Sequence, residues 1–172
     1  MTTPPLQTER LSLEPLEVSH AAEMVELLAP RSLYAFYPEE PSPSLVELTE
    51  RYERQVRGQS ADGTQVWHNW ILRERSSGLA VGFVQATVIG DTAELAWVLG
   101  EAHQRKGFAT EAATTVRDAF TTETIGIPVT SLIAHIAPGH TGSESVAQRL
   151  GLRPTEIWYD GEIRWHLSVS DS

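Results

Sequence analysis

Residues 104–111 read QRKGFATE and follow the apolar run Leu95–Leu99. An apolar run of this length is long enough for a strand and too short for a helix. After the segment, apolar residues recur at helical spacing as far as Phe120. The segment therefore predicts a turn that leads from a strand into the N-terminus of a helix.

The chemistry of this turn points to an anion site. The first backbone N–H groups of a helix have no partner within the helix, and the positive end of its dipole lies behind them. Gly107 allows unusual dihedral angles and close approach of a ligand, and Arg105 and Lys106 add positive charge. A phosphate or pyrophosphate is the natural occupant.

The composition is that of one folded domain. Apolar residues make up 41% of the 172 residues and charged residues 21%, which are globular rather than disordered values. The length suits one domain with a core, so we expect a single domain over residues 1–172 with a loose N-terminal arm at residues 1–8.

The net charge and the absence of long apolar runs in the sequence argue against several classes of protein. The excess of 23 acidic over 13 basic residues, a net charge of −10, argues against a nucleic-acid binder. This charge favours a cationic substrate, although solubility alone is the simpler explanation. The chain has no run of about 18 apolar residues and no basic segment followed by an apolar one at its start, so we expect no membrane partner and no signal peptide. It has no Cys, which excludes disulfides and fits the cytoplasmic location that we expect.

The chain before the turn reads as strand, helix, loop, helix. A strand is expected near Leu11–Pro15 and a helix from Val18 to Pro30. Residues 31–43 are rich in Pro and aromatics and form either a hydrophobic lid over the core or a wall of the substrate pocket. A capping box at residues 44–47 then opens a helix that ends at Gly58.

The remaining elements complete a mixed sheet. Three strand-like runs, at residues 66–73, 81–88 and 93–99, are joined by short turns and predict an antiparallel meander. A further strand is expected at Ser131–Ile136, and the helix between it and residues 93–99 requires the two strands to be parallel. A short helix, opened by Thr141 or Ser143, and a terminal hairpin with an Asp-Gly turn follow. The fold class is therefore mixed α+β, with one parallel pair in an otherwise antiparallel sheet.

These residues resemble a known family. The pattern Gln104-x-x-Gly107-x-Ala109 matches the Gln/Arg-x-x-Gly-x-Gly/Ala signature of the GCN5-related N-acetyltransferases, called GNAT. The segments AELAWVL (residues 93–99) and GFATEA (residues 107–112) resemble the branch that includes ribosomal-protein N-acetyltransferases. The later run from Ser143 to Leu152 resembles the second motif of that branch. The resemblance covers nearly the whole chain.

The resemblance implies a fold and a cosubstrate. The fold is a sheet of about six or seven strands, mostly antiparallel, with one splayed parallel pair and about four flanking helices. Acetyl-CoA is expected to lie in the splay, its pyrophosphate on the backbone amides of residues 105–110 and its pantetheine beside the strand that ends at Leu99. The expected cofactor-binding residues are Trp97, Val98, Leu99, Gln104, Arg105, Lys106, Gly107, Phe108, Ala109, Thr110, His140 and Ser143. A plain turn with a surface basic pair is the rival interpretation, and it leaves Gly107 without a reason.

The resemblance also suggests catalytic groups. Glu94 matches a family glutamate that takes the proton of the amine, and a strand-start Glu that is solvated or paired with Arg is the alternative. Glu156 competes for this role, because some relatives use a glutamate just before the terminal hairpin. Ser143 is expected to donate to the thiol sulfur, or to cap its helix, or both. The Tyr that many relatives carry on this helix is missing.

The histidines of the chain include one candidate cofactor contact and no pattern typical of metal ligands. His140 stands where the family often has Asn, so we expect it to contact the cofactor. His135 reads as a packed strand residue and is not assigned a role. The six His residues show no ligand-like spacing, so no metal site is expected.

The expected function is N-acetyl transfer. The acetyl group moves from acetyl-CoA to a primary amine, a small amine or a peptide N-terminus, by direct attack in a ternary complex; the alternative is a catalytically idle acyl-CoA sensor. The expected acceptor-binding residues are aromatic: Tyr34, Tyr37, Trp67 and Trp158. If they do not bind the acceptor, they belong to the core. The expected partners are acetyl-CoA and the amine, with the chain as a monomer or homodimer.

Overall fold

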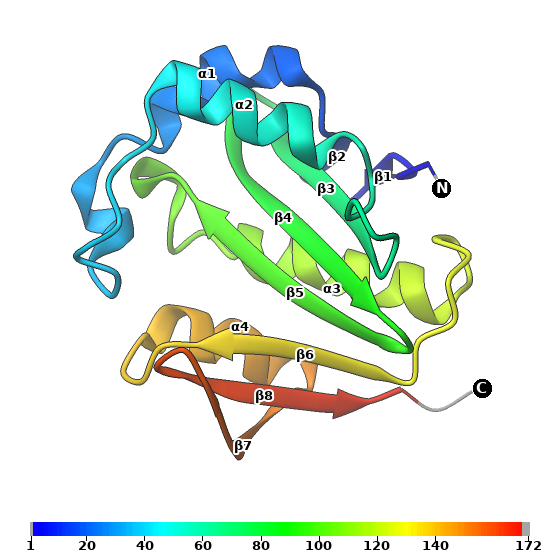
Figure 1. Ribbon diagram of the computed structural model, residues 1–172. Helices are drawn as coiled ribbons and strands as arrows, with labels where there is room; N and C mark the ends of the chain where they lie inside the picture. Colours follow the sequence, from blue (N-terminus) through cyan, green and yellow to red (C-terminus); the bar gives the residue numbers. More distant parts are fainter. Residues whose placement is uncertain (1, 170–172) are drawn as a thin grey trace.

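A computed structural model describes residues 2–169 of the protein, which form one twisted sheet covered by helices on both faces (Figure 1). The sheet has eight strands in the order β1-β2-β3-β4-β5-β6-β8-β7. The strands are β1 Leu6–Gln7, β2 Leu11–Pro15, β3 Gln65–Glu74, β4 Ala80–Ile89, β5 Thr92–Leu99, β6 Ser131–Ile136, β7 Arg153–Tyr159 and β8 Glu162–Ser168. All neighbours are antiparallel except β5 and β6, as predicted.

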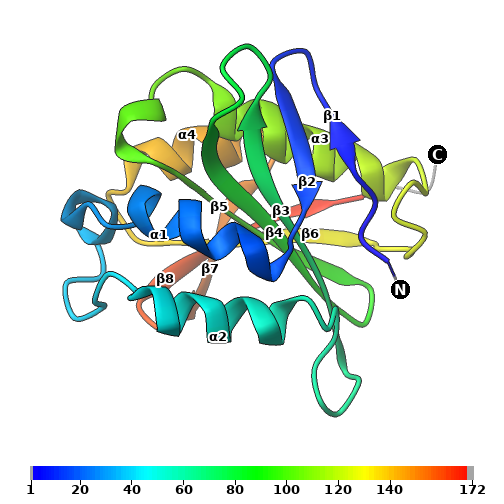
Figure 2. The same cartoon turned by 90° about the horizontal axis from the view of Figure 1, so that it is seen from above.

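Four α-helices form the outer layers, two on each face (Figure 2). They are α1 Ala21–Leu27, α2 Leu45–Gln55, α3 Phe108–Thr121 and α4 Thr141–Leu150, and short 3-10 turns lie at η1 Val18–His20, η2 Arg31–Tyr34 and η3 Glu101–His103. Helices α1 and α2 pack on the face that presents Ile71, and α3 packs on the face that presents Trp70. Within residues 2–169, no helix has both the length and the apolar content needed to cross a membrane.

The parallel pair opens along its length. Strand β5 pairs with β6 only at Thr92↔Ser131, Ala93↔Leu132 and Glu94↔Ile133. Beyond Glu94 the two strands diverge, so the backbone of Ala96–Leu99 has no strand partner on that side. The predicted splay is therefore confirmed, and it lies between the N-termini of α3 and α4.

Alternation along the two parted strands decides which side chains meet. Side chains at every second position share one face of a strand. Leu132 and Ala134 are buried with α3 and α4, so Ile133 and His135 point to the opposite face, toward α1 and α2. Leu95 packs with α3, which places Glu94 on the same face as His135.

The N-terminal arm is more ordered than the sequence indicated. Leu6–Gln7 pairs with β2 as an edge strand, and Pro4 accepts a hydrogen bond of 2.7 Å from the indole of Trp70. Thr3 lies 3.0 Å from Nδ1 of the buried His68. The prediction of a loose arm over residues 1–8 is therefore wrong for residues 3–7, because these contacts come from strands far along the chain. Met1 lies outside the described residues.

Of two predicted helix starts, one is confirmed and one differs. The capping box at Ser44 and Glu47 is confirmed. Neither Thr141 nor Ser143 caps α4: the cap is His140, whose Nδ1 accepts from the backbone N–H of Ser143 at 3.3 Å.

Candidate active site

A cleft of about 870 Å3 occupies the splay between β5 and β6. Its walls come from the whole of Glu94–Leu99, from Ala134–Ile136, and from the first turns of α3 and α4. The loop after η2 closes one side of it. Segments that are far apart in the sequence thus meet where β5 and β6 part.

The N-terminus of α3 presents unpaired amides to this cleft. Gly107 is the N-cap, at φ +81°, and no side chain caps the helix. A residue with a Cβ is strained in this left-handed conformation, so glycine suits the position. Gln104, Arg105, Gly107, Ala109 and Thr110 line the cleft, as the sequence analysis expected.

Two residues of the predicted cofactor loop have other surroundings. Phe108 is 2% exposed and packs in the core beneath α3. Lys106 does not line the cleft; its carbonyl oxygen accepts a hydrogen bond of 2.8 Å from Arg10. The helical period turns Phe108 away from the face that Ala109 and Thr110 present, whereas Lys106 lies in the turn before the helix.

Arg10 braces the turn from the other end of the chain. Its guanidinium forms an ion pair of 2.7 Å with Glu111 and stacks 4.5 Å from the ring centre of Phe108. Its backbone N–H donates to the same Glu111 carboxylate at 3.1 Å. Sequence reasoning missed Arg10, because nothing local to residue 10 indicates a contact about one hundred residues away.

The N-terminus of α4 supplies the opposite wall. Ser143, Val146 and Arg149 line the cleft from one face of the helix, together with Gly142 and Ser145. Arg149 was not predicted, yet its helical spacing from Ser145 and Gly142 was a usable signal. With Arg105, from the turn before α3, it makes two cations in the lining.

His140 and Ser143 form a local hydrogen-bonded unit. Nδ1 of His140 accepts from the Ser143 N–H, and Nε2 lies 3.3 Å from the Ser143 hydroxyl. Burial lowers the pKa of His140 below its ordinary value, so its imidazole is neutral at neutral pH. The single proton then lies on Nε2 and is donated to Ser143 Oγ. The hydroxyl of Ser143 is left with its own proton to donate into the cleft.

Glu94 lies at the narrow end of the splay. One of its oxygens, Oε1, is 2.7 Å from Nδ1 of His135. The paired alternative that the sequence left open is therefore present, but the partner is a histidine and not an arginine. Glu94 lines the cleft with 40% of its side chain exposed.

Glu156 lies elsewhere. It is exposed on the edge strand β7 and does not line the cleft. The β7–β8 register shifts between Pro154 and Trp158, so this stretch leaves the regular ladder. Of the two glutamates considered as the base, the structure brings only Glu94 into the cleft.

The loop over residues 35–40 crosses the cleft and joins its two halves. The Tyr37 hydroxyl donates a hydrogen bond of 2.5 Å to Glu162 on β8. The ring of Phe36 stacks on His140, with centres 4.5 Å apart and planes 12° from parallel. Burial, reinforced by the bond to Glu162, raises the pKa of Tyr37, so its hydroxyl remains a donor at physiological pH.

The other predicted acceptor residues do not reach the cleft. Tyr34 donates its hydroxyl to the carbonyl of Leu28 and so is bound within its own segment. Trp67 bonds Gln65 on its own strand, and Trp158 is 60% exposed on β7. None of the three lines the cleft, and of their elements only η2 contributes lining residues, Ser32 and Leu33.

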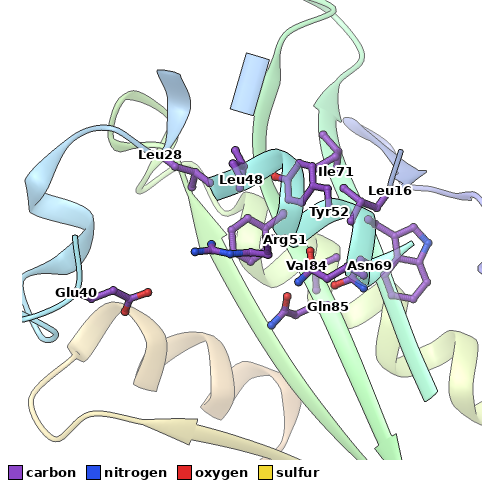
Figure 3. Close-up of a pocket in the computed structure, with 13 residues that line it drawn as sticks. Leu16, Leu28, Glu40, Leu48, Arg51, Tyr52, Asn69, Ile71, Val84 and Gln85 are labelled. Carbon is purple, nitrogen blue, oxygen red and sulfur yellow. The ribbon is translucent and has the colours of Figure 1, made fainter. Parts of the chain in front are cut away.

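A second cavity of about 240 Å3 lies beside the cleft, under α2 (Figure 3). The two share Glu40, Phe83 and Gln85 in their linings. Leucine and isoleucine side chains form its inner wall, while Arg51, Asn69 and Gln85 supply polar groups (Figure 3). Asn69 and Gln85 are direct cross-strand partners on β3 and β4. This cavity extends the cleft on the face of the sheet opposite α3 and α4.

The charges in the cleft are separated. Arg105 lies in the turn before α3 and Arg149 on α4, whereas the carboxylates of Glu40, Glu94 and Glu162 come from the loop, β5 and β8. This arrangement suits an anionic ligand part against the helix N-termini and a cationic part against the carboxylates. Among residues 2–169, no group of three or more His, Cys, Asp or Glu side chains is placed to hold a metal ion.

Comparison with known proteins agrees with this geometry. A family model described as an acetyltransferase (GNAT) domain matches residues 10–153. No curated protein matches the chain in sequence. A GNAT-family acetyltransferase from Bacillus anthracis has a similar structure, with a TM-score of 0.76 at 18% identity over 96% of this chain and 98% of its own.

Two further solved structures are similar and carry ligands. A ribosomal L7/L12 alpha-N-protein acetyltransferase in complex with coenzyme A has a TM-score of 0.77 at 12% identity, covering 98% of this chain and 100% of its own. Spermidine N-acetyltransferase from Vibrio cholerae, in complex with CoA and spermine, has a TM-score of 0.72 at 20% identity, covering 94% and 96%. At these identities the similarity shows a shared fold.

Proposed function

The chain belongs to the GNAT family of acetyltransferases, and from this membership we propose that it moves the acetyl group of acetyl-CoA to a primary amine. The acceptor is a small amine or a peptide N-terminus. One observation supports this most: the parallel strands part beside a helix N-terminus that is capped only by Gly107. A free strand edge suits an amide-bearing arm, and unpaired helix amides suit a pyrophosphate.

We propose direct transfer in a ternary complex. The amine nitrogen attacks the thioester carbonyl carbon, a C–N bond forms, and the C–S bond breaks to release CoA thiolate. Glu94 takes the proton that the nitrogen loses, because it is the carboxylate at the narrow end of the splay. The backbone N–H groups of β5 that lack a strand partner, near Val98, are the candidate donors to the carbonyl oxygen.

The leaving thiolate carries a negative charge until it takes a proton from water, and we propose that the Ser143 hydroxyl stabilises it by donating a hydrogen bond to the sulfur. His140 donates Nε2–H to Ser143 Oγ, which leaves the serine proton directed elsewhere. A hydroxyl that accepts one hydrogen bond becomes a better donor in the next. This pair replaces the Tyr that many relatives carry on the same helix, and His140 thus acts as a cap and as a support for Ser143.

The acceptor is proposed to enter from the face of α1 and α2. There Phe36 and Tyr37 provide aromatic surface, and Glu40 and Glu162 provide negative charge that suits an ammonium group. The second cavity has room for part of the acceptor body, with apolar wall and amide groups together. Spermidine, tyramine and a tetrapeptide with a free N-terminus represent the classes that this space fits.

A pair of glycine variants tests the cofactor site. Gly107→Asp adds a negative charge at the N-terminus of α3 beside the proposed pyrophosphate site, with its Cβ 3.4 Å from Nη2 of Arg10. Gly126→Asp adds one at φ +75°, with open space around it, beyond the C-terminal end of α3. Both substitutions carry similar backbone strain of about 1–2 kcal/mol. We expect acetyl-CoA to raise the melting temperature of the parent and of G126D, and to leave that of G107D unchanged.

The same proteins are assayed for release of free CoA with the three named amines. Transfer by the parent and by G126D, but not by G107D, supports an enzyme. Binding of acetyl-CoA without CoA release for any amine would instead favour the idle acyl-CoA sensor. An equal ligand-induced shift in G107D and G126D would place the cofactor elsewhere.

A further inference from the structure

Glu94 is the first of three side chains that are hydrogen-bonded in series across the sheet. Its Oε1 lies 2.7 Å from Nδ1 of His135, and Nε2 of His135 accepts from Nε of Arg164 at 3.1 Å. The three residues come from β5, β6 and β8. Sequence reasoning left His135 and Arg164 without a role.

Arg164 determines which nitrogen of His135 carries the proton. A guanidinium has only N–H donors, so Nε2 of His135 must be the acceptor in their bond. A neutral imidazole whose Nε2 accepts carries its proton on Nδ1. His135 therefore donates Nδ1–H to Glu94, and Glu94 accepts with one oxygen of its carboxylate.

The register of the sheet builds this arrangement. Glu94 and Ile133 are the last paired residues of β5 and β6, and His135 is the next residue of β6 on the same face. Arg164 is the direct partner of His135 on β8. The side chain of His135 is 7% exposed and lies under the ring of Tyr159, with centres 5.1 Å apart. A buried, packed imidazole thus contacts a carboxylate that is 40% exposed to the cleft.

We propose that His135, oriented by Arg164, is a positioning residue that holds the Glu94 carboxylate by a hydrogen bond in the orientation in which it receives the proton of the acceptor amine. The inference rests on the proposed function of Glu94 as the base. It also excludes a relay through the imidazole: Nδ1 already carries a proton, and the lone pair of Nε2 is engaged by Arg164. The proton is therefore held on Glu94, as the N–H bond breaks and an O–H bond forms, until it passes to water.

The alternative is that Glu94 and His135 only clamp two strands together. The sheet contains a matched example of such a clamp, because Nε2 of His166 on β8 lies 3.2 Å from the hydroxyl of Ser131 on β6. Neither residue lines the cleft. Loss of His166 therefore reports what the loss of an inter-strand histidine bond does to the fold without touching Glu94.

The other ionisable groups around Glu94 are the same in variants of His135 and of His166. They are Tyr37 and Glu40 from the loop, His140 before α4, Tyr159 at the end of β7 and Glu162 on β8. Within the described residues, the hydrogen bond to the Glu94 carboxylate comes from His135. A change in pH dependence that follows substitution of His135 is therefore assigned to that bond.

His135→Ala is the decisive variant, assayed with the named amine that has the highest kcat/KM. We expect kcat to fall about 10- to 100-fold, because a general base contributes about 10²- to 10⁴-fold when correctly held. The acid limb of the kcat profile should move to higher pH, since an ionised carboxylate that loses a donor is more easily protonated. The dissociation constant for acetyl-CoA should stay within about twofold.

His135→Asn is the rescue, because its side-chain amide supplies an N–H near the position of Nδ1. We expect H135N to recover most of kcat and the parent pH profile, and H166A to match the parent in both. If H135A loses melting temperature as H166A does but keeps the parent kcat and pH profile, His135 is only a clamp and the proposal is wrong.

Nitrogen-detected NMR of the His135 ring tests the tautomer without any acceptor. We expect the Nδ1–H form in the parent and its loss in Arg164→Met; a parent in the Nε2–H form would overturn the inference.

The kinetic comparison includes Glu94→Gln. Full activity of E94Q would refute the proposed base itself, whereas a large loss in E94Q with a parent-like H135A would refute only the role of His135.

Discussion

The fold alters the pKa of individual side chains in this protein by burying them. His68 is an example away from the cleft: it is 0% exposed, stacks near Trp70 and Phe120, and bonds Thr3 through Nδ1. Its Nε2 is buried without a hydrogen-bond partner among the described residues. Burial, with a smaller contribution from the N-terminal charge, lowers the pKa of His68 below its ordinary value.

This lowered pKa predicts acid sensitivity of the fold. Since the unfolded chain binds a proton on His68 more readily than the folded chain, the free energy of unfolding should fall as the pH drops below about 6.5. His68→Gln cannot be protonated, so its free energy of unfolding should fall less between pH 7 and pH 5. Denaturant unfolding at both pH values measures this, and equal slopes for parent and variant would contradict it.

Among the elements, the loop over residues 35–40 has the clearest part in function. It joins the half of the fold that carries α1 and α2 to the half that carries α4 and β8. Its two links are the Tyr37–Glu162 hydrogen bond and the Phe36–His140 stack. Both lie at the mouth through which the acceptor is proposed to enter, so the loop should define the pocket.

Loss of the Tyr37 hydroxyl should loosen this loop. We expect Tyr37→Phe to raise KM for the acceptor about 3- to 10-fold with little change in kcat, because the ring stays while one neutral-to-charged hydrogen bond is lost. Tyr34→Phe is the matched control, since the Tyr34 hydroxyl bonds Leu28 in its own segment. Limited proteolysis should cut Y37F faster than Y34F within residues 31–43. Equal KM values for the two variants would show that the link has no part in binding.

The molecule as a unit combines a strong negative charge with a local cationic site. The net charge is −10, yet Arg105 and Arg149 line the cleft beside two helix N-termini. The negative electrostatic field of the whole protein attracts a cationic acceptor, while the two arginines and the helix N-termini suit a phosphate. In the proposed function, separate electrostatic features of one cleft would therefore recognise the two substrates.

Salt should accordingly weaken the acceptor reaction. Added salt shortens the screening length from about 10 Å at 0.1 M to about 3 Å at 1 M. We expect kcat/KM for spermidine to fall several-fold between 0.05 M and 0.5 M NaCl, and kcat/KM for the singly charged tyramine to fall less. Steady-state kinetics at saturating acetyl-CoA measure this, and identical salt dependence for the two amines would rule out steering by the charge of the protein.

Local sequence signals determined most of the elements and the family. The run from Leu95 to Phe120 encodes strand, turn and helix through spacing alone, because each period depends only on near neighbours. The parallel pairing of β5 and β6 follows from the connection between them. The glycine at position 107 indicated a backbone free to take unusual dihedral angles, and the structure has it at φ +81°.

The identity of the neighbours in the site depended on the tertiary structure. The sequence favoured Glu94 as the base and left Glu156 as a competitor, and it is the splay that brings Glu94 into the cleft while Glu156 stays on the irregular edge strand. The contacts of Arg10 with Glu111 and of Tyr37 with Glu162 join residues about one hundred positions apart. Such contacts depend on strand register and on where pairing stops, and these result from the packing of all the elements together. For that reason the sequence indicated a strand at His135, while the fold alone placed its imidazole between Glu94 and Arg164.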